Sequence, residues 1–363
     1  MHCIDPRCAS DHLAGNSRRR FLAGAGALAG SLAAPGFFAP SEAIAQATAL
    51  PRLIDVHHHI VPPFWFEELK DRIQAQGGGI IAPQWIGWSP QKAMAEMDKN
   101  GVDISMISMT TPGIWFGDVA QARRLARAYN DYAANIVRDF PKRFGLFGTL
   151  PLPDTEGSLR EIEYLFDTLK ADGIGLMTSY GSQWLGDPAF LPVLEELNRR
   201  KAVIYVHPAT PLCCTALMRY VPPYFAEFQQ DTTRTILSLV YSKSIQKLRD
   251  IKFIFSHSGG TLPMVAGRIE FFSAWPQFKD VVPNGLLAEL PRFHYDVANA
   301  ANKPALSALT ALVPTSQILF GSDYPLATIE ETSGNLTQLG FGQADLLKIA
   351  RENAMRLIPR LKA

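Results

Sequence analysis

The sequence has few cysteines and no excess of charge of either sign. Four cysteines occur in 363 residues, so neither a disulfide scaffold nor a Cys-x-x-Cys metal site is expected. Lysine and arginine number 35 against 34 acidic residues, which gives a formal net charge of +1. This balance offers no electrostatic basis for binding nucleic acid or an anionic membrane surface. Because a vicinal disulfide is strained, Cys213 and Cys214 are expected to be two thiols.

Long, strongly apolar runs are also scarce, and the run nearest the N-terminus is rich in alanine and glycine. Arg18 and Arg19 precede this stretch, and small residues around Ala45 offer cleavage sites. The arrangement resembles a twin-arginine (Tat) export signal. A transmembrane anchor is the alternative, but the run is too weakly apolar to span a bilayer. We therefore predict a signal peptide at 1–47 and a periplasmic or secreted protein at 48–363 that has no membrane span.

After Pro51, short β-branched runs alternate with helical stretches, and no flexible linker divides them. Helices are expected at 118–138, 158–170 and 188–200, among others. Eight strands that alternate with helices predict a closed parallel (β/α)8 barrel. A doubly wound open sheet is the alternative, but no G-x-G-x-x-G turn follows any strand. The predicted strands are Leu53–His57, Val102–Met109, Arg143–Thr149, Gly173–Met177, Val203–His207, Lys252–His257, Phe293–Val297 and Gln317–Phe320.

Histidines stand together at the end of the first predicted strand, in Asp55-Val56-His57-His58-His59. Alternate residues of a strand share a face, so His57 and His59 point one way and His58 points the other. Two imidazoles side by side suit a divalent metal. A hydrogen-bonded structural cluster is the alternative reading. Asp55 is a candidate partner for the His57 ring, and a simple buried hydrogen-bonding role is equally consistent with the sequence.

Three further strands end in side chains that can bind a metal. His207 ends the fifth strand, His257 the sixth, and Asp323 follows the eighth in Gly-Ser-Asp-Tyr-Pro. In a barrel, the carboxyl ends of all strands meet at one rim, where active sites are built. A helix cap is the alternative role for Asp323. The coincidence of these strand ends favours a metal site over unrelated packing roles.

This pattern resembles the amidohydrolase superfamily, and within it the branch of the aminocarboxymuconate-semialdehyde decarboxylases. The similarity extends from Leu53 to about Pro359. The chain is most similar to 6-methylsalicylate decarboxylase-like proteins through 55–63 and through His207-Pro208 with the nearby Cys213-Cys214. The resemblance implies that His57, His59, His207 and Asp323 hold the metal and that His257 is an acid/base. Asp323 is also expected to act catalytically.

The resemblance further implies one metal and a homodimer. Dinuclear members of the superfamily need a bridging Lys or Glu at the end of the fourth strand, where this chain has Met177-Thr178-Ser179. Three imidazoles and a carboxylate favour Zn2+, and Mn2+ is also compatible with these ligands.

Substrate-binding candidates lie on segments that follow strands. The resemblance implies that Arg268, eleven positions after His257, lies near the active site and could hold a substrate carboxylate, with a surface or helix-pairing role as the alternative. Several aromatic residues could line a flat pocket, although core packing would account for each one singly. They are Phe64, Trp85, Trp88, Trp115, Tyr180 and Trp184.

The expected activity is non-oxidative decarboxylation of a small aromatic or unsaturated acid, such as the 2-hydroxybenzoate 6-methylsalicylate. A metal-dependent hydrolase of a lactone, ester or amide could use the same site. A third possibility is a secreted metal-binding protein without catalysis, which would have no need of His257. Detection of carbon dioxide distinguishes the first two activities.

Overall fold

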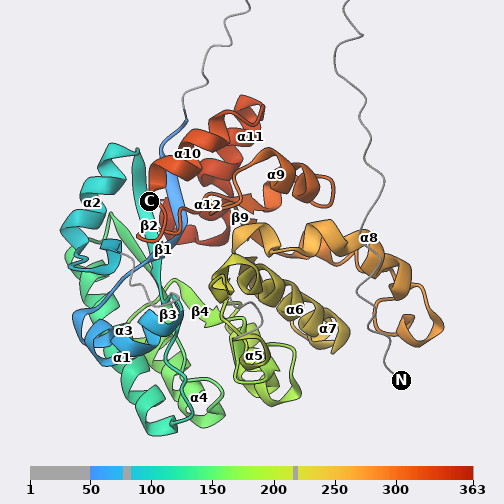
Figure 1. Ribbon diagram of the computed structural model, residues 1–363, viewed down its shortest axis with the longest axis horizontal. Coiled ribbons are helices and arrows are strands. Elements are labelled where there is room, and N and C mark those ends of the chain that lie inside the picture. The colour runs from blue at the N-terminus through green and yellow to red at the C-terminus, as the bar shows by residue number, and fades with distance from the viewer. Residues whose placement is uncertain (1–49, 77–82, 216–219, 363) are drawn as a thin grey trace, which may run out of the picture. The chain divides into compact units, whose positions relative to one another are not determined.

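The computed structural model describes residues 50–76, 83–215 and 220–362, so the predicted signal peptide lies outside the described residues. Every predicted strand is present, with ends within about two residues of the predicted ones. Figure 1 shows the strands at the centre with helices around them. The strands are β1 (Leu53–His59), β2 (Val102–Ser108), β3 (Phe144–Thr149), β4 (Gly173–Met177), β7 (Val203–His207), β8 (Lys252–Phe255), β9 (His294–Asp296) and β10 (Ile318–Leu319).

These eight strands form one parallel sheet in the order β1-β2-β3-β4-β7-β8-β9-β10. The sheet closes through backbone hydrogen bonds between β1 and the residues at and after β10. The amide of Val56 donates to the carbonyl of Phe320 (3.0 Å), and the amide of Asp323 donates to the carbonyl of His57 (2.8 Å). The predicted (β/α)8 barrel is therefore confirmed, and its closure places Asp323 beside His57.

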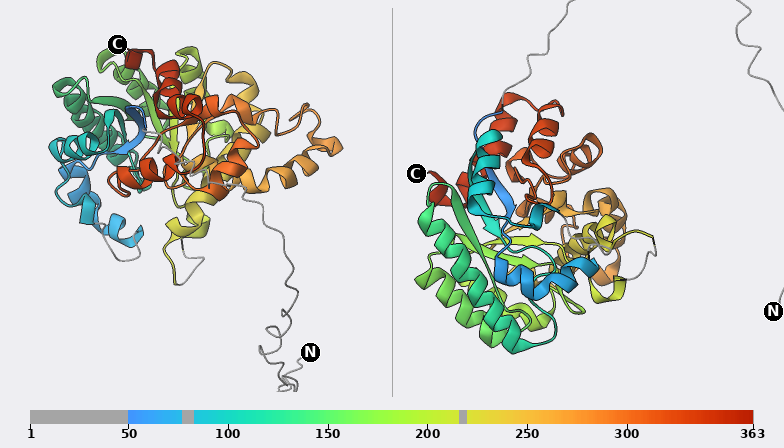
Figure 2. Two further views of the ribbon diagram at one scale, coloured as in Figure 1. Left: turned by 90° about the horizontal axis from the view of Figure 1, so that it is seen from above. Right: turned by 60° about the vertical axis from the view of Figure 1, so that its left-hand side comes forward.

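The helices form the outer layer, as the two views of Figure 2 show. In α3 (Val119–Asp139) the buried residues recur every three or four positions, from Ala122 to Ile136, which is the signature of a helix packed on one face. The predicted helix at 158–170 begins earlier, at Thr155. The other helices are α1 (Pro63–Gln76), α2 (Pro90–Lys99), α4 (Thr155–Glu163), α5 (Leu191–Arg199), α6 (Glu227–Tyr241), α7 (Ser244–Lys247), α8 (Leu262–Ser273), α9 (Lys303–Thr310), α10 (Ile329–Thr337), α11 (Gln343–Leu347) and α12 (Asn353–Leu357).

A short antiparallel hairpin, β5 (Ser179–Tyr180) and β6 (Gln183–Trp184), follows β4 and was not predicted. Asp231 of α6 anchors it, because the carboxylate accepts hydrogen bonds from the Ser179 hydroxyl and the Trp184 indole. The buried carboxylate thus ties the hairpin to the helix layer.

Apolar side chains fill the barrel interior beneath the carboxyl ends of the strands. A buried cluster includes Val56, Met106, Phe147, Tyr205 and Ile254, and the rings of Phe147 and Tyr205 stack with centroids 5.6 Å apart. A packed interior of this kind leaves the barrel mouth as the place for a site. Among the described residues, no helix is both long and apolar enough to cross a membrane.

Candidate metal centre

Ionisable side chains from four strand ends converge at the mouth of the barrel. Ligand atoms of His57, His207, His257 and Asp323 all lie within 4.8 Å of one another, and all four residues are buried. His59 belongs to the same group, because its Nε2 is 3.1 Å from both His57 Nε2 and Asp323 Oδ1. The structure therefore brings all five predicted residues together.

Three of the imidazoles are held from behind at Nδ1. His57 Nδ1 lies 3.0 Å from Asp296 Oδ2, and His207 Nδ1 lies 3.0 Å from the carbonyl oxygen of Pro208. His59 Nδ1 lies 3.4 Å from the carbonyl oxygen of Ser108 and 3.3 Å from its hydroxyl. A carbonyl or carboxylate behind Nδ1 fixes the tautomer in which Nε2 carries a free lone pair, as metal-binding histidines require. Each ring thus presents Nε2 to the centre of the group.

Two atoms at the centre suit a bound cation. His207 Nε2 and Asp323 Oδ1 are buried and have no hydrogen-bond partner within the part of the chain that the structure describes. Buried polar atoms without partners are costly, and coordination to a metal would satisfy both. This buried set of three imidazoles and a carboxylate suits one divalent metal.

The two oxygens of Asp323 face different neighbours. Oδ1 is 3.1 Å from His57 Nε2, whereas Oδ2 is 3.4 Å from His257 Nε2 and accepts a hydrogen bond from Asn299. His257 has no partner at Nδ1 among the described residues, unlike the three anchored rings. The geometry therefore separates His257, on one side of the carboxylate, from His57 and His59 on the other.

Charge within the group favours an ionised Asp323 beside a cationic His57. Burial opposes protonation of His57, but the charges of Asp296 and Asp323 outweigh it and raise the pKa of His57 to about 10. Burial would raise the pKa of Asp323, yet His57 and the surrounding hydrogen bonds hold it well below its ordinary value. Burial lowers the pKa of His207 well below the ordinary value and also lowers that of His59. A metal cation at the centre would take the place of the proton on His57 Nε2, and the ring would then be neutral and offer its lone pair to the metal.

The sequence interpretation missed Asp296, at the end of β9. This fully buried carboxylate is hydrogen-bonded to the His57 ring, to the backbone amide of His257 (3.0 Å) and to the Tyr205 hydroxyl (3.1 Å). It occupies the same kind of position, a polar residue at the carboxyl end of an apolar strand, that identified His207. The signal that would have found it was therefore present in the sequence.

Asp55 does not take the predicted role of orienting the His57 ring. Its carboxylate contacts the ring of His58 (3.1 Å) and accepts hydrogen bonds from the amide and the hydroxyl of Ser322. An irregular register between Asp55 and His58 interrupts the simple alternation of β1. Asp55 therefore secures the turn that precedes Asp323, which is the structural role left open by the sequence.

Residues 54–360 match the Amidohydrolase family. The chain belongs to this family. Decarboxylase yanB of Aspergillus niger is 34% identical over 328 residues, covering 85% of this chain and 88% of the relative. The 6-methylsalicylic acid decarboxylase acuB of Aspergillus aculeatus is 34% identical over 330 residues, covering 85% and 96%. A dihydroxybenzoic acid decarboxylase structure from Polaromonas sp., with bound manganese and the inhibitor 2-nitroresorcinol, shares the fold with a TM-score of 0.74 at 21% identity, covering 86% and 98%.

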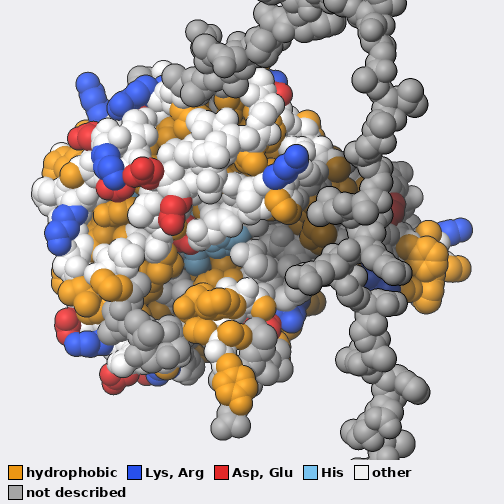
Figure 3. Space-filling view, turned by 45° about the horizontal axis from the view of Figure 1, so that its top comes forward, with side chains coloured by type: hydrophobic (Ala, Val, Ile, Leu, Met, Phe, Trp, Pro, Cys, Tyr) orange, Lys and Arg blue, Asp and Glu red, His pale blue; other side chains and the backbone are white. Residues whose placement is uncertain are grey.

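In this amidohydrolase, a cavity of about 460 Å3 opens above the metal centre. Figure 3 shows histidine surface, in pale blue, within a hollow that has hydrophobic side chains on one side. His257 and Asp323 belong to the cavity wall, and Trp85 is the one predicted substrate residue in that wall. The remaining lining residues are Ile73, Gln84, Thr111, Pro112, Tyr224, Phe228, Gln229, Asn299, Leu326 and Ala327.

The other predicted substrate residues lie elsewhere. Trp115 and Tyr180 line a neighbouring cavity of about 480 Å3, which shares Pro112 with the first. Trp88 is buried in the core. Arg268 is exposed on α8, where its guanidinium lies 5.0 Å from the Phe272 ring centroid, and it does not line the cavity above the metal centre.

The two remaining aromatic candidates pack or bond away from the metal centre. The Phe64 ring packs against Tyr132 with centroids 6.1 Å apart, and the Trp184 indole donates to Asp231. Neither residue lines the cavity above the centre.

Two further expectations concern the segments after β4 and β7. No Lys or Glu stands at the end of β4, where the Thr178 hydroxyl bonds Asp231 instead. Cys213 and Cys214 form a vicinal disulfide, so the expectation of two thiols was wrong. Both cysteines lie in one short helical turn, Leu212–Cys214, which brings the sulfur atoms together.

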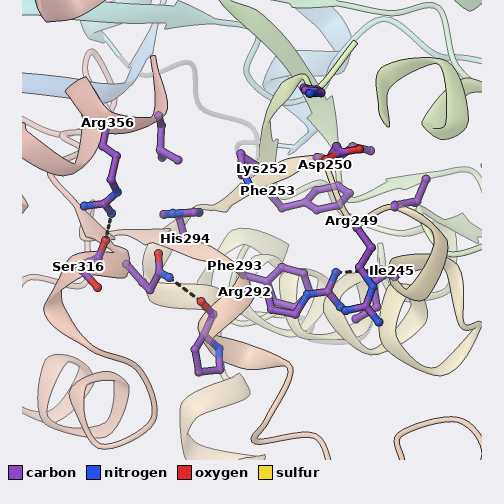
Figure 4. Close-up of a pocket in the computed structure, with 16 residues that line it drawn as sticks. Ile245, Arg249, Asp250, Lys252, Phe253, Arg292, Phe293, His294, Ser316 and Arg356 are labelled. Atoms are coloured by element: carbon purple, nitrogen blue, oxygen red, sulfur yellow. Dashed lines mark hydrogen bonds between the residues drawn. The ribbon is translucent and has the colours of Figure 1, made fainter. Parts of the chain in front are cut away.

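A larger cavity, of about 810 Å3, lies at the opposite end of the barrel. Lys252 and His294, which line it, begin β8 and β9, so the cavity is at the amino ends of the strands. In Figure 4, Arg356 bonds the carbonyl of Ser316 and Arg292 bonds that of Ile245. None of the five residues of the metal centre lines it. The site of chemistry is thus the smaller cavity, which holds those residues.

Proposed function

We propose that the protein is a metal-dependent decarboxylase that removes carbon dioxide from a small 2-hydroxybenzoate of the 6-methylsalicylate type. The observation that carries this proposal is the position of Asp323, which joins the buried metal centre to a cavity of about 460 Å3. A cavity of this size with a largely apolar wall suits a single substituted ring. The chain is a carboxy-lyase of the amidohydrolase superfamily, as its curated relatives are.

His57, His59, His207 and Asp323 are assigned as metal ligands. Their support is the anchoring of the three imidazoles at Nδ1 and the free Oδ1 of Asp323. When bound, the metal acts as a Lewis acid toward the ortho oxygen and carboxylate of the substrate. His257, on the other side of Asp323, is assigned as the residue that hydrogen-bonds the substrate oxygen.

Asp323 is ionised in the free centre. In the proposed reaction it takes up a proton when the substrate binds and then supplies that proton. The bond between the ring carbon and the carboxylate carbon breaks, and carbon dioxide leaves. The electron pair left on the ring carbon takes the proton from Asp323, so a carbon–hydrogen bond replaces the carbon–carbon bond. For 6-methylsalicylate the product is 3-methylphenol, and Asp323 regains a proton from solvent.

The resident metal is proposed to be Zn2+. Imidazole nitrogens and carboxylate oxygens are both zinc ligands, and a catalytic zinc site keeps one position open for substrate. Manganese is the competing assignment, since the dihydroxybenzoic acid decarboxylase of Polaromonas sp. was crystallised with it. Metal analysis of the protein purified without added metal decides between the two.

The decisive experiment is a substrate screen of residues 48–363 loaded with metal. We expect equimolar 3-methylphenol and carbon dioxide from 6-methylsalicylate, and no turnover of 2-methylbenzoate, which lacks the ortho hydroxyl. Chelation of the metal should abolish turnover, and His257→Ala should retain metal while losing activity. Hydrolysis of a lactone or ester without carbon dioxide would instead establish the hydrolase alternative.

Export through the twin-arginine pathway is also proposed, on the basis of Arg18 and Arg19 in the first 47 residues. Residues 1–47 fused to a folded fluorescent reporter should direct it to the periplasm of a bacterium that has this pathway. Replacing both Arg18 and Arg19 with lysine should keep the reporter in the cytoplasm. Cytoplasmic retention of the unaltered fusion would refute the proposal.

A homodimer is proposed from the family resemblance, with support from exposed apolar side chains. Met264 and Phe271 of α8 are 75% and 66% exposed, and Trp275 just beyond it is 45% exposed. The α8 segment projects from the barrel in Figure 2 (left view, orange). Burial against a second copy would remove this surface from water.

A further inference from the structure

Asn299 lies in a tightly constrained turn that follows β9. Its φ is +52°, in the left-handed region that asparagine tolerates better than most other residues with a side chain. The amide of Ala298 donates to Asp296 Oδ1 (3.0 Å), and the amide of Ala300 donates to the carbonyl of Val297 (3.0 Å). The bonds on either side hold the backbone of the turn at Asn299.

The Asn299 side chain bonds the predicted metal ligand Asp323, which follows the neighbouring strand β10. Nδ2 of Asn299 donates to Oδ2 of Asp323 over 2.6 Å, the shortest of the contacts to this oxygen. Asp323 also has a left-handed backbone, with a φ of +66°. Both ends of the bond are therefore attached to backbone that the surrounding structure must hold in an uncommon conformation.

The hydrogen bond fixes the plane of the Asp323 carboxylate. The last torsion of an aspartate side chain is broad, so without this bond the carboxylate plane could turn away from the imidazoles at little cost. Oδ2 is taken by Asn299, so Oδ1 faces His57 and His59, each 3.1 Å away at Nε2. Asn299 is neutral at any working pH, so it offers this donor without adding a charge to the buried group.

We propose that Asn299 is a positioning residue that fixes the plane of the Asp323 carboxylate, so that one oxygen faces the metal and the other faces His257 and the substrate cavity. This inference rests on the proposed function. Asn299 itself lines the cavity and is exposed, so it acts from the substrate side of the carboxylate. β9 thus supplies an anchor for each side of the centre, with Asp296 behind His57 and Asn299 beside Asp323.

The test compares Asn299→Gly with Asn302→Ala. Glycine keeps the left-handed backbone and removes the amide donor. Asn302 lies three positions further on and caps α9 by accepting from the amide of Ala305 (3.0 Å), away from the centre. We expect Asn299→Gly to weaken metal binding about tenfold, measured by competition with a chelator, and to lower kcat with KM changed less than about twofold.

The control should lose thermal stability through its lost cap while keeping the metal affinity of the unaltered protein. Asn299→Ala serves as a second variant if the glycine variant folds poorly, and circular dichroism establishes folding for both. Metal affinity and kcat equal to those of the unaltered protein in a folded Asn299 variant would overturn the proposal. Chelator competition needs no substrate, so a protein that decarboxylates no 2-hydroxybenzoate would refute the proposed function while leaving the Asn299 result readable.

Discussion

Single residues behind the imidazoles determine how the centre can bind a cation. His57 lies between two carboxylates, with Asp296 at Nδ1 and Asp323 near Nε2. Asp296 therefore fixes the tautomer of a ring whose Nε2 is a predicted metal ligand. Its further bonds to the His257 amide and the Tyr205 hydroxyl join the acid/base residue to the same anchor.

Asp296→Asn should weaken metal binding about 10- to 100-fold, because the amide keeps the shape but not the negative charge behind His57. Chelator competition measures the change. Asp172→Asn is the matched control: Asp172 pairs with Arg360 and precedes β4 at the opposite end of the barrel. An Asp296→Asn protein with unchanged metal affinity would show that the carboxylate has only a packing role.

Among the elements, β9 shows what local patterning revealed and what it did not. Its apolar run predicted a strand at 293–297, and the structure has one at His294–Asp296. The bond from Asp296 to His57 spans 239 positions of the chain, and the bond from Asn299 to Asp323 spans 24. No local pattern specifies such partners, because they depend on the order of the strands in the barrel and, for Asp296 and His57, on its closure.

Helix α8 carries the prediction on assembly. Phe271→Glu would place an unpaired carboxylate in any interface formed by this helix, which costs several kcal/mol when buried. We expect the dissociation constant of the homodimer to rise at least about 100-fold in sedimentation experiments. Val119→Glu, on α3, replaces another exposed apolar residue and should leave the dimer intact. A dimer that tolerates Phe271→Glu would place the interface on another surface.

At the scale of the whole molecule, the buried His294 links stability to pH. Burial, with smaller contributions from Arg356 and Lys252, lowers the pKa of His294 to about 4. Below the unfolded pKa of 6.5 the unfolded chain gains a proton that the folded chain refuses, so stability falls as pH drops from about 6.5 to 4. The loss from this group is roughly 3 kcal/mol.

The free energy of unfolding, measured by urea denaturation, should fall as the pH drops from about 6.5 to 4. We expect it to fall less in His294→Gln than in the unaltered protein. Tyr295→Phe, at the next position, removes a group that does not titrate in this range. Its free energy of unfolding should therefore change with pH as that of the unaltered protein does. If the free energy of unfolding fell equally with pH in His294→Gln and in the unaltered protein, His294 would gain a proton readily in the folded state.

The sequence by itself determined the strands, the barrel and the five polar residues at the strand ends, because these follow from local periodicity and from the rule that strand ends meet at one rim. It also indicated the amidohydrolase family, and the match of residues 54–360 to that family confirms the prediction. Tertiary structure alone decided the partners of those residues. Asp296 rather than Asp55 holds the His57 ring, because barrel closure brings the end of β9 close to that of β1, and Arg268 does not line the cavity. Asn299 bonds Asp323 because the turns after the neighbouring strands β9 and β10 meet at the rim.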